Sequence, residues 1–481
     1  MTNYFNERNY LKTDKKNAVW KQNLKPDEYE QKMLKQRGFE YDYKNRLRLN
    51  HNKFIQYAIK RIRALNYAEK VYFYNFKNKS YEKLEEPQYK KIFFYIIEEA
   101  STEVWKKKME SEYIPYFLRK LPYAEDNGMK PGWLHFPNAI IDMENQELYE
   151  PTPDIFSLVQ IPYNYDENAE APLFMEFLND IFEGDQERID LIQEIMGTCL
   201  YYEDVLQKLV VFLGSGSNGK SLLSNIIKKM LGEKNVSAIA LDKLGGNRFS
   251  KQNLDRKLLN ISSETKSEKL YSTSDLKTLT GGDSVEIEEK FEKSYTTEIH
   301  SKFILLANDM IQTKDYSDGF YRRLLIIPFN RRYQDLAPGQ EPEEGVFYKD
   351  VTLEERITEE LPGIFNFAFE GLLRYVNNDY NLTNSSVCNE ALEHYKNEHN
   401  VVKAFINECL TIHEPEEKVK TKRSELFPAF KNFCYKNQFS HNMSSIQFLR
   451  LFRNITEDEC LGIDEVHLNT GDYMKNVSIR K

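Results

Sequence analysis

Apolar and polar positions follow different spacings along the chain, and the clearest alternation of the two lies in residues 201–335. Short apolar runs recur there, separated by longer amphipathic segments: LVVFL, KLLNIS, SKFILLA and LLIIPF. Strands that alternate with helices in this way are typical of an α/β layer built around a parallel sheet. The sequence therefore predicts an α/β fold with a central parallel sheet for this part of the chain.

The flanking segments have other patterns. Within residues 1–85, the stretch KVYFYNFKNKSYEKL predicts a strand, a turn and a second strand. Residues 86–200 favour helices around a middle rich in Pro, Asn and Asp. After the linker YQDLAPGQEPEEGVF, helices are expected to about residue 395. We thus expect four regions: a basic segment 1–85, a mainly helical region 86–200, an α/β core 201–395 and a small terminal domain 396–481.

Composition places the chain among globular proteins. Of its 481 residues, 41% are apolar and 13% aromatic, enough to bury substantial cores. No window approaches a membrane span, and the N-terminus lacks a signal-peptide core. Five cysteines occur without a C-x-x-C pair, which is consistent with free thiols in a reducing compartment. We expect a cytosolic protein with no membrane partner.

Charge is unevenly distributed along the chain. The net charge is −9, but residues 1–80 carry +11, with 19 Lys and Arg against 8 Asp and Glu. A basic segment attached to an acidic body can follow a nucleic-acid backbone. Solvated helix faces explain the same charges equally well, so charge alone leaves both interpretations open.

The stretch LVVFLGSGSNGKSLLSNIIKKML joins an apolar run to an amphipathic segment through a glycine-rich turn. The turn fits G-x-x-x-x-G-K-[ST], the loop whose backbone N–H groups surround phosphates at a helix N-terminus. Lys220 would neutralise the outer phosphates, and the Ser221 hydroxyl would ligate Mg²⁺. The residues predicted to bind a nucleoside triphosphate are Gly214, Ser215, Gly216, Ser217, Asn218, Gly219, Lys220 and Ser221.

The same turn also fits G-x-G-x-x-G, the dinucleotide fingerprint, through Gly214, Gly216 and Gly219. That interpretation requires an acidic residue after a second strand, and Asp242 ends the stretch VSAIALD. A dinucleotide site needs neither the lysine nor the serine that follow Gly219. The phosphate-binding loop is therefore the favoured prediction, with dinucleotide binding as the alternative.

Three later apolar runs lie beside polar residues that suit hydrolysis of a nucleoside triphosphate. KLLNISSET brings Glu264, whose carboxylate could polarise the attacking water and ligate the metal directly or through water. SKFILLAN delivers Asn308, which could orient that water. Arg322 and Arg323 precede LLIIPF, and a guanidinium can stabilise the transferred phosphoryl group of a neighbouring subunit's site. Each residue type is common at strand ends, but their order after the glycine turn favours a catalytic site.

Residues from about 135 to 395 resemble superfamily 3 helicases of the phage, plasmid and poxvirus primase-helicase branch. The resemblance is carried by GSGSNGKS, NISSET, LKTLTGGDSVEIEEKFEKSYTTEIHSKFILLAND and GFYRRLLIIPF. It implies an AAA+ core after a collar-like helical region, a hexameric ring, and ATP-driven translocation on single-stranded DNA with Mg²⁺. Members include replication initiators of staphylococcal pathogenicity islands and cassettes. The resemblance thus also implies replication of a mobile genetic element in the cytoplasm of a bacterial host.

By that resemblance, the catalytic roles fall to Lys220, Glu264, Asn308 and Arg323. Arg323 rather than Arg322 is similar to the family's arginine finger, because it stands directly before the apolar strand. Lys208, upstream of the first strand, resembles a lysine that reaches the γ-phosphate of a second subunit. A solvated lysine at a strand end is an equally good interpretation of Lys208.

The stretch between TGGD and FILLAN matches the hairpin that lines the ring channel and grips DNA in this family. Lys290, Phe291 and Lys293 fall near its tip. Independently, VEIEEKFEKSY predicts a strand that approaches a turn, and a lysine beside an aromatic ring suits a phosphate contact with base stacking. An exposed hairpin with solvated lysines is the alternative.

Residues 401–481 resemble the winged-helix ending common in this branch. SELFPAFKNFCYKN and SSIQFLRLFRNI predict two helices, the second with Arg450 and Arg453 one turn apart, and IDEVHLNTGDYMKNVSIRK predicts two strands around a turn. A recognition helix with these arginines would suit duplex DNA at an origin. The segment holds 12 Lys and Arg against 11 Asp and Glu, so a purely structural domain stays open.

Other functions fit the sequence less well. The spacings among Cys388, His394, His399, Cys409 and His413 disfavour a zinc site. A bifunctional primase-helicase would need a nucleotidyl-transfer site, and the N-terminal part holds no convincing D-x-D pattern. The hairpin lysines disfavour an origin-binding ATPase that does not translocate. The prediction is therefore an ATP-dependent replicative DNA helicase, with these two functions as alternatives.

Overall fold

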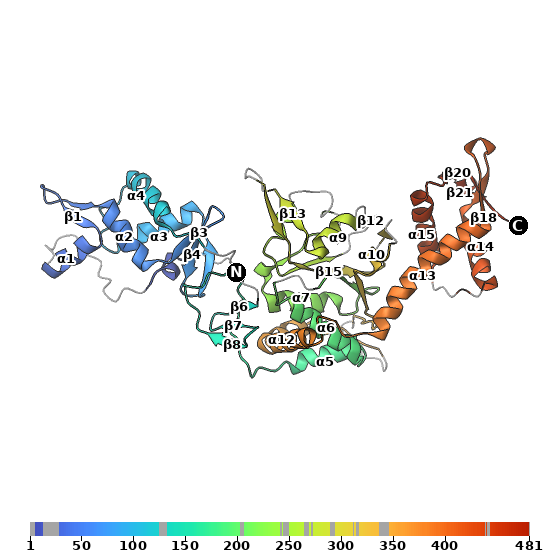
Figure 1. Ribbon diagram of the computed structural model, residues 1–481, viewed down its shortest axis with the longest axis horizontal. Coiled ribbons are helices and arrows are strands. Elements are labelled where there is room, and N and C mark those ends of the chain that lie inside the picture. Colours follow the sequence, from blue (N-terminus) through green and yellow to red (C-terminus); the bar gives the residue numbers. More distant parts are fainter. Residues whose placement is uncertain are drawn as a thin grey trace. The chain divides into compact units, whose positions relative to one another are not determined.

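The structure, a computed structural model, describes most of the chain. The described residues are 5–12, 28–124, 132–202, 206–240, 243, 250–263, 269–270, 273–288, 294–310, 312–313, 317–335, 346–437, 439 and 443–480. The chain forms two compact units, Met1–Glu167 and Asn168–Lys481. Figure 1 shows their helices and strands.

The first unit combines helices with small antiparallel sheets. Its helices are α1 (Glu28–Gln36), α2 (His51–Arg61), α3 (Glu86–Glu98) and α4 (Lys107–Lys120). Its strands are β1 (Phe39–Tyr41), β2 (Leu47–Leu49), β3 (Ala64–Tyr67), β4 (Lys70–Asn75), β5 (Ser80–Lys83), β6 (Trp133–His135), β7 (Ile140–Asp142) and β8 (Glu147–Tyr149). They pair as β1–β2, β3–β4–β5 and β6–β7–β8. The antiparallel pair β4–β5 confirms the strand, turn and strand predicted from KVYFYNFKNKSYEKL.

Helical spacing of apolar residues accounts for the core of the first unit. In α2 the side chain of Asn50 caps the first turn, and Phe54, Ile55 and Ala58 are fully buried on one face. They join the buried faces of α3 and α4 in one apolar cluster. The prediction of a mainly helical segment over residues 86–200 misses the sheet β6–β7–β8, because its three-residue strands are too short for alternation to reveal.

The second unit is built around a parallel sheet. Its strands are β9 (Leu209–Leu213), β10 (Val236–Ser237), β11 (Leu259–Ser263), β15 (Lys302–Ala307) and β17 (Leu324–Pro328). Among the described residues they lie in the order β10–β11–β15–β9–β17, and each neighbouring pair is parallel. The predicted α/β fold with a central parallel sheet is thereby confirmed. The apolar runs form its buried strands, as expected for a sheet covered on both faces.

Helices and short strand pairs surround this sheet. The helices are α5 (Pro172–Ile181), α6 (Gln186–Thr198), α7 (Lys220–Leu231), α9 (Thr273–Gly281), α10 (Asp318–Tyr321), α11 (Leu353–Thr358) and α12 (Leu361–Asn377). The short pairs are β12 (Lys269–Leu270) with β16 (Gln312–Thr313), and β13 (Ser284–Ile287) with β14 (Tyr295–Glu298). The pair β13–β14 confirms the strand predicted from VEIEEKFEKSY.

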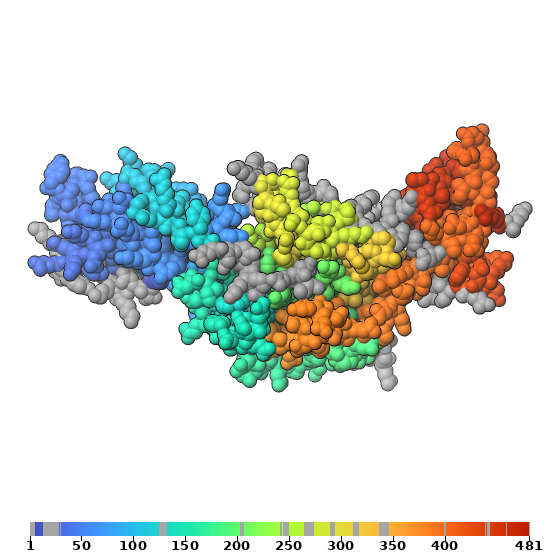
Figure 2. Space-filling model, in the orientation of Figure 1, coloured from blue at the N-terminus to red at the C-terminus, as the bar shows by residue number. Residues whose placement is uncertain are grey.

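α6 and α12 pack unusually close, because each has a glycine at the contact. A Cβ built on Gly197 would lie 2.4 Å from the backbone nitrogen of Leu372, and one on Gly371 would lie 2.2 Å from the carbonyl oxygen of Gln193. Neither position therefore tolerates a larger side chain without moving a helix. Figure 2 shows the surface of α12 in orange beside the green surface of the preceding helices.

The C-terminal part of the second unit has its own apolar core. Its elements are α13 (Ser386–Cys409), β18 (Leu410–Ile412), β19 (Lys420–Lys422), α14 (Arg423–Lys436), α15 (Ser445–Asp458), β20 (Glu465–Leu468), β21 (Gly471–Lys475) and β22 (Val477–Ile479). α13 serves two cores, because Tyr395 packs under the parallel sheet while Val402 and Phe405 pack against α14 and α15. The two helices and the hairpin β20–β21 confirm the sequence prediction, and β22, paired with β18, is an addition to it.

Candidate functional site

The carboxyl ends of the parallel strands meet at one edge of the sheet, where a cavity of about 680 Å³ opens. β9 leads directly into the predicted phosphate-binding loop, β11 ends at Ser263, and β15 is followed by Asn308. Residues 216–222, Ser263 and Asn308 line the cavity. The structure thus brings the loop and Asn308 together, as expected for residues that follow parallel strands.

The loop enters α7 through left-handed backbone conformations. Gly216 and Gly219 have φ of 97° and 86°, which glycine adopts without the steric cost of a side chain. Gly219 is the N-cap of α7. The first N–H groups of a helix have no acceptor within the helix, and its N-terminus attracts negative charge. This end of the cavity is therefore built to receive an anion.

Lys220 is only 5% exposed, and two neutral oxygen atoms accept hydrogen bonds from its ammonium group. Its Nζ donates a hydrogen bond to the Gly214 carbonyl oxygen and another, of 3.0 Å, to Asn218 Oδ1. Asn218 in turn donates from Nδ2 to the Phe329 carbonyl oxygen at 3.2 Å. A Cβ on Gly214 would lie 2.0 Å from Asn218 Nδ2, so glycine is required for this contact. The loop thereby orients the lysine in part through neutral dipoles.

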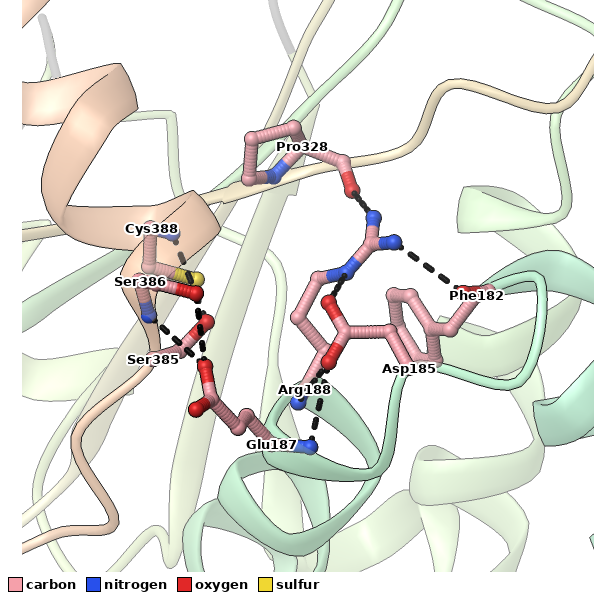
Figure 3. A network of polar contacts seen from close by, with 8 residues as sticks. All are labelled: Phe182, Asp185, Glu187, Arg188, Pro328, Ser385, Ser386 and Cys388. Atoms are coloured by element: carbon pink, nitrogen blue, oxygen red, sulfur yellow. Dashed lines mark hydrogen bonds and ion pairs between the residues drawn. The ribbon is translucent and has the colours of Figure 1, made fainter.

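A buried arginine supports the segment to which Asn218 binds. Arg188 of α6 donates from Nε to Asp185 Oδ2 at 2.6 Å, from Nη1 to the Pro328 carbonyl oxygen at 2.8 Å and from Nη2 to the Phe182 carbonyl oxygen at 3.0 Å. Figure 3 shows its guanidinium between these three partners. Arg188 therefore fixes the end of β17 immediately before Phe329, behind the loop.

Figure 3 also shows how the same helix reaches the start of α13. Glu187 Oε2 accepts hydrogen bonds from the Ser386 N–H and hydroxyl, both at 2.8 Å. The hydroxyl of Ser385 caps α13 by accepting from the Cys388 N–H. The helix that enters the C-terminal part is thus anchored on the same turn of α6 that supports the loop.

Two segments outside the sheet complete the walls of the cavity. α5 contributes Leu173 and Phe177, and the chain before α11 contributes Tyr348 and Val351. Apolar and aromatic side chains with a few polar groups are typical of a pocket for a small ligand. This wall suits a flat aromatic base, while the loop suits phosphates.

Acidic side chains in the walls are held by partners of their own. Asp180 accepts from Arg331 Nη1 at 2.7 Å and from the Tyr333 hydroxyl. Burial and the Asp180 carboxylate together raise the pKa of Tyr333. Lys229 lies 2.9 Å from Glu354 Oε1, and its hydrogen bond lowers the pKa of that carboxyl. These pairs reduce the repulsion that the carboxylates would exert on a polyphosphate.

The predicted arginine lies at the opposite edge of the sheet. The carbonyl oxygen of Arg323 accepts a hydrogen bond of 2.7 Å from the N–H of Leu209, the first residue of β9. Because β9 and β17 are parallel, Arg323 lies at their amino ends, whereas Lys220 lies beyond their carboxyl ends. Arg323 Nη1 donates to the Gly319 carbonyl oxygen at 2.9 Å. The residues that line the cavity of the same chain do not include Arg323.

Two further basic residues share this amino edge. Lys208 donates from Nζ to the carbonyl oxygen of Arg322 at 2.5 Å. Partial burial, with a smaller contribution from the Arg322 charge, lowers the pKa of Lys208. Lys208, Arg322 and Arg323 therefore form a basic group away from the cavity.

Several predicted residues lie outside the described part of the chain: Glu264, Lys290, Phe291, Lys293 and the alternative acid Asp242. Ser263, the residue before Glu264, lines the cavity.

The predicted DNA-contacting arginines of α15 both have acidic partners. Arg453 Nη2 pairs with Glu465 of β20, and Arg450 Nη1 lies 3.5 Å from Asp309 Oδ2. Arg423 of α14 joins Glu465 and Asp472, each at 2.6 Å. We call Arg423, Arg453, Glu465 and Asp472 the wing-face ion pairs. Their charges largely cancel within the face.

The strand order contradicts the dinucleotide alternative. In a dinucleotide-binding fold, the strand that follows the first helix pairs with the first strand. Here the strand that follows α7 is β10, and β11 and β15 separate it from β9. The strand after the first helix is therefore not the neighbour of β9 that a dinucleotide site requires. The described geometry fits the phosphate-binding loop alone.

Sequence reasoning missed the walls of the cavity and the support behind the loop. Phe177, Tyr333 and Tyr348 carry no motif, and Arg188 bonds to a carbonyl 140 residues away. An Asp185–Arg188 pair at helical spacing is the single local signal for the supporting arginine. The amino-acid sequence gives no sign of the partners that Arg188 contacts across the fold.

Two structural features are absent from the described residues. No helix there combines the length and apolar character that crossing a membrane requires. No group of three or more His, Cys, Asp or Glu in that part of the chain is placed to hold a metal ion.

Family models match two parts of the chain. Residues 27–183 match the family described as "D5 N terminal like". Residues 212–323, which include the loop and Asn308, match "Family of unknown function (DUF5906)".

Curated relatives are viral. The chain is 24% identical over 322 residues to "Putative helicase L207/L206" of Acanthamoeba polyphaga mimivirus, covering 64% of this chain and 33% of that protein. It is 22% identical over 357 residues to "Putative helicase 121R" of Invertebrate iridescent virus 3, covering 67% and 37%. The chain thus spans about a third of the length of these relatives. These matches support a relation to primase-helicase and superfamily 3 helicase-like proteins.

Solved structures include the apo C-terminal region of NrS-1. It is 13% identical with a TM-score of 0.43, covering 93% of this chain and 98% of that one.

Proposed function

We propose that the protein is an ATP-dependent DNA helicase that serves replication of a mobile genetic element. In this proposal the second unit contains an AAA+ core that assembles into a hexameric ring around single-stranded DNA. The observation that carries it is the cavity where residues 216–222 meet Ser263 and Asn308. The position of β9 between β15 and β17 supports an ATPase core of this class. The likeness to viral proteins named as helicases supports the DNA-unwinding part.

The residues of the cavity suit ATP with Mg²⁺. A Cβ on Gly216 would meet no atom within 4 Å, so the backbone there faces open space that phosphates can occupy. The wall with Phe177 and Tyr348 would take the base. Ser221 would hold Mg²⁺, with Glu264 bound to it directly or through water, and the ion would neutralise charge on the phosphate oxygens.

The chain's own residues then have distinct roles in hydrolysis. Lys220 would bind the outer phosphates. Glu264, which follows the cavity residue Ser263, would accept a hydrogen bond from the attacking water, and Asn308 would orient it. The water oxygen bonds to the γ-phosphorus as the bond to the bridging oxygen breaks, giving ADP and phosphate.

Assembly into a ring would give Arg323 a catalytic role although it lies away from the cavity of its own chain. The Arg323 guanidinium lies at the amino edge of the sheet, away from the cavity of its own chain. In a head-to-tail ring, the cavity of the neighbouring chain could lie beside it. We therefore assign Arg323 to the site of the adjacent subunit. Lys208 would add positive charge at that interface.

DNA would be gripped by Lys290, Phe291 and Lys293 in the channel. We also propose that residues 396–481 form a winged-helix domain that recognises an origin duplex through Arg450 and Arg453. Helices α14 and α15 with the hairpin β20–β21 support that domain type. DNA phosphates would have to replace Glu465 and Asp309 as partners of these arginines.

Strand displacement on forked DNA tests the function. Purified chain with ATP and Mg²⁺ should separate a fork with either a 3′ or a 5′ tail, whichever matches its polarity. Glu264→Gln should still bind ATP but hydrolyse it about 100-fold more slowly, because the amide cannot activate water. It should therefore fail to displace the strand. ATP hydrolysis at the wild-type rate in Glu264→Gln would contradict the site, and hydrolysis without displacement on either fork would contradict the helicase.

A further inference from the structure

The hairpin β1–β2 of the first unit carries an aromatic and basic tip that the proposed motor does not use. Exposure rises from its base to its tip: Phe39 is 2% exposed, Tyr41 44% and Tyr43 88%. The base packs into the core of the unit, with Leu49 opposite Phe39. Figure 1 shows the hairpin extending from α2. The tip therefore adds little to the core but places a tyrosine in solvent.

The turn is closed by backbone hydrogen bonds that its sequence explains. Asp42 N–H donates to the Arg46 carbonyl oxygen, and Asn45 N–H donates to that of Asp42, both at 2.9 Å. Asn45 has φ of 58°, which asparagine tolerates better than most residues. This is a three-residue hairpin loop closed by a left-handed residue. Tyr43 is thus presented by a preorganised turn, so ordering it on a ligand costs little entropy.

One carboxylate organises the positive charge of this tip. Asp42 Oδ2 accepts from Arg48 Nε at 2.7 Å and from Arg46 Nε at 3.1 Å. Hydrogen bonds from the Arg46 backbone N–H and from these guanidiniums lower the pKa of Asp42, which stays ionised. Its side chain is 9% exposed, whereas those of Arg46 and Arg48 are 56% and 61% exposed. The arginines are therefore oriented by the acid but keep most of their surface toward solvent.

The charge of the tip is not balanced. Lys44, Arg46 and Arg48 face Asp42 over residues 42–48, while Glu40, opposite Arg48, is paired with Lys53 of α2. The Lys44 ammonium lies 5.4 Å from the centroid of the Tyr43 ring. A phosphate held by Lys44 would therefore bring its adjoining base beside that ring. An unpaired nucleotide strand has free base faces that can stack on an aromatic ring, and phosphates that attract cations. The exposed tyrosine and the excess of cations at this tip therefore suit such a strand.

We propose that the β1–β2 hairpin binds single-stranded nucleic acid, with a base stacked on Tyr43 and phosphates held by Lys44, Arg46 and Arg48. Unpaired DNA and RNA share this chemistry. A duplex hides the faces of its bases, so it would use the cations without the tyrosine. The inference concerns the first unit and does not depend on ATP hydrolysis.

Fluorescence anisotropy of a labelled 20-nucleotide oligo(dT) with the full chain tests this contact. Tyr43→Ala should weaken binding about 5- to 100-fold through the lost stacking, and Tyr43→Trp should restore it. Tyr123→Ala is the matched control, because Tyr123 is 75% exposed in the same unit but lies outside the hairpin. Equal affinities of Tyr43→Ala and Tyr123→Ala would overturn the proposal.

Salt dependence tests the cations independently. Arg46→Gln with Arg48→Gln should reduce the slope of log K against log salt by about 1.4, since each phosphate contact on a single strand contributes about 0.7. An unchanged slope would overturn the assignment of phosphates to this tip.

Two comparison ligands separate the sources of the signal. The loss in Tyr43→Ala should appear with oligo(dT), with oligo(U) or with both, which identifies the strand that binds. An equal loss on a 20-base-pair duplex would overturn stacking on an unpaired base. A wild-type chain that binds no oligonucleotide would overturn the hairpin proposal, while ATP hydrolysis in the same sample still reports on the nucleotide site.

Discussion

The phosphate-binding loop and the wing face both carry cations that the sequence singles out, yet the fold treats them differently. Lys220 is buried beside the carbonyl oxygen of Gly214 and the amide oxygen of Asn218. Arg453 and Arg423 instead meet the carboxylates of Glu465 and Asp472. Neutral dipoles orient a cation without cancelling its charge, whereas a carboxylate cancels it. An anion at the loop therefore meets the N-terminus of α7 beside Lys220, whereas one at the wing face must first displace ion pairs.

The hairpin β1–β2 is intermediate between these two sites in how far its cations are paired with carboxylates. At its tip, Asp42 contacts two guanidiniums that remain more than half exposed, while Glu40 pairs with Lys53 of α2. The comparison suggests that the number of acids around a basic cluster matters more for phosphate binding than the number of cations. The predictions below test that difference at the loop and at the wing face.

The largest effect is expected at the loop. Lys220→Ala should lower the rate of ATP hydrolysis at least about 1000-fold, to background. The reason is that no buried cation would then neutralise the charge on the phosphates. Phosphate release at saturating ATP measures this, and a melting curve shows whether the variant folds. Lys228→Ala is the control, since Lys228 lies in the last turn of the same helix. Near-normal turnover by folded Lys220→Ala would remove the basis for the nucleotide site.

A mixture of two inactive variants tests whether Arg323, at the amino edge of the sheet, acts in the site of a neighbouring chain. Arg323→Ala alone should lower hydrolysis about 1000-fold if its guanidinium completes a neighbour's site. In an equal mixture with Lys220→Ala chains, random assembly should restore about one quarter of the wild-type rate, because one interface in four then has both residues. Rates are measured after co-assembly and compared with each variant alone. No recovery in rings shown to be mixed would place Arg323 outside the catalytic interface.

The smallest effect is expected at the wing face. Glu465→Gln with Asp472→Asn should strengthen binding to duplex DNA about 5- to 10-fold per released arginine at 0.1 M salt. Arg453→Ala added to that double variant should remove the part of the gain that this arginine supplies. Anisotropy with a labelled duplex measures both. Glu425→Gln, which removes an exposed acid from α14, is the control. An increase no greater than that of the control would show that the ion pairs do not limit DNA binding.

The sequence alone was sufficient for those parts of the molecule that depend on neighbours in the chain. The apolar runs became β9, β11, β15 and β17, and the helix after the glycine turn begins at Lys220. The antiparallel pair β4–β5 followed from alternation and turn residues. Such features can be predicted because hydrophobic period, turn chemistry and loop spacing act over a few residues.

Only the tertiary structure decided which distant residues share a surface. It separated β10 from β9, which rules out the dinucleotide alternative, and it put Arg323 at the edge opposite Lys220. It also joined Arg188 to Pro328 and α5 to the walls of the cavity. Strand order and polar contacts arise between segments that are not adjacent in the chain, up to 140 residues apart for Arg188 and Pro328, and local spacing carries no information about them. The sequence by itself therefore determined the chemistry of the phosphate-binding loop, while the fold decided what surrounds that loop and which cations of the wing face meet carboxylates.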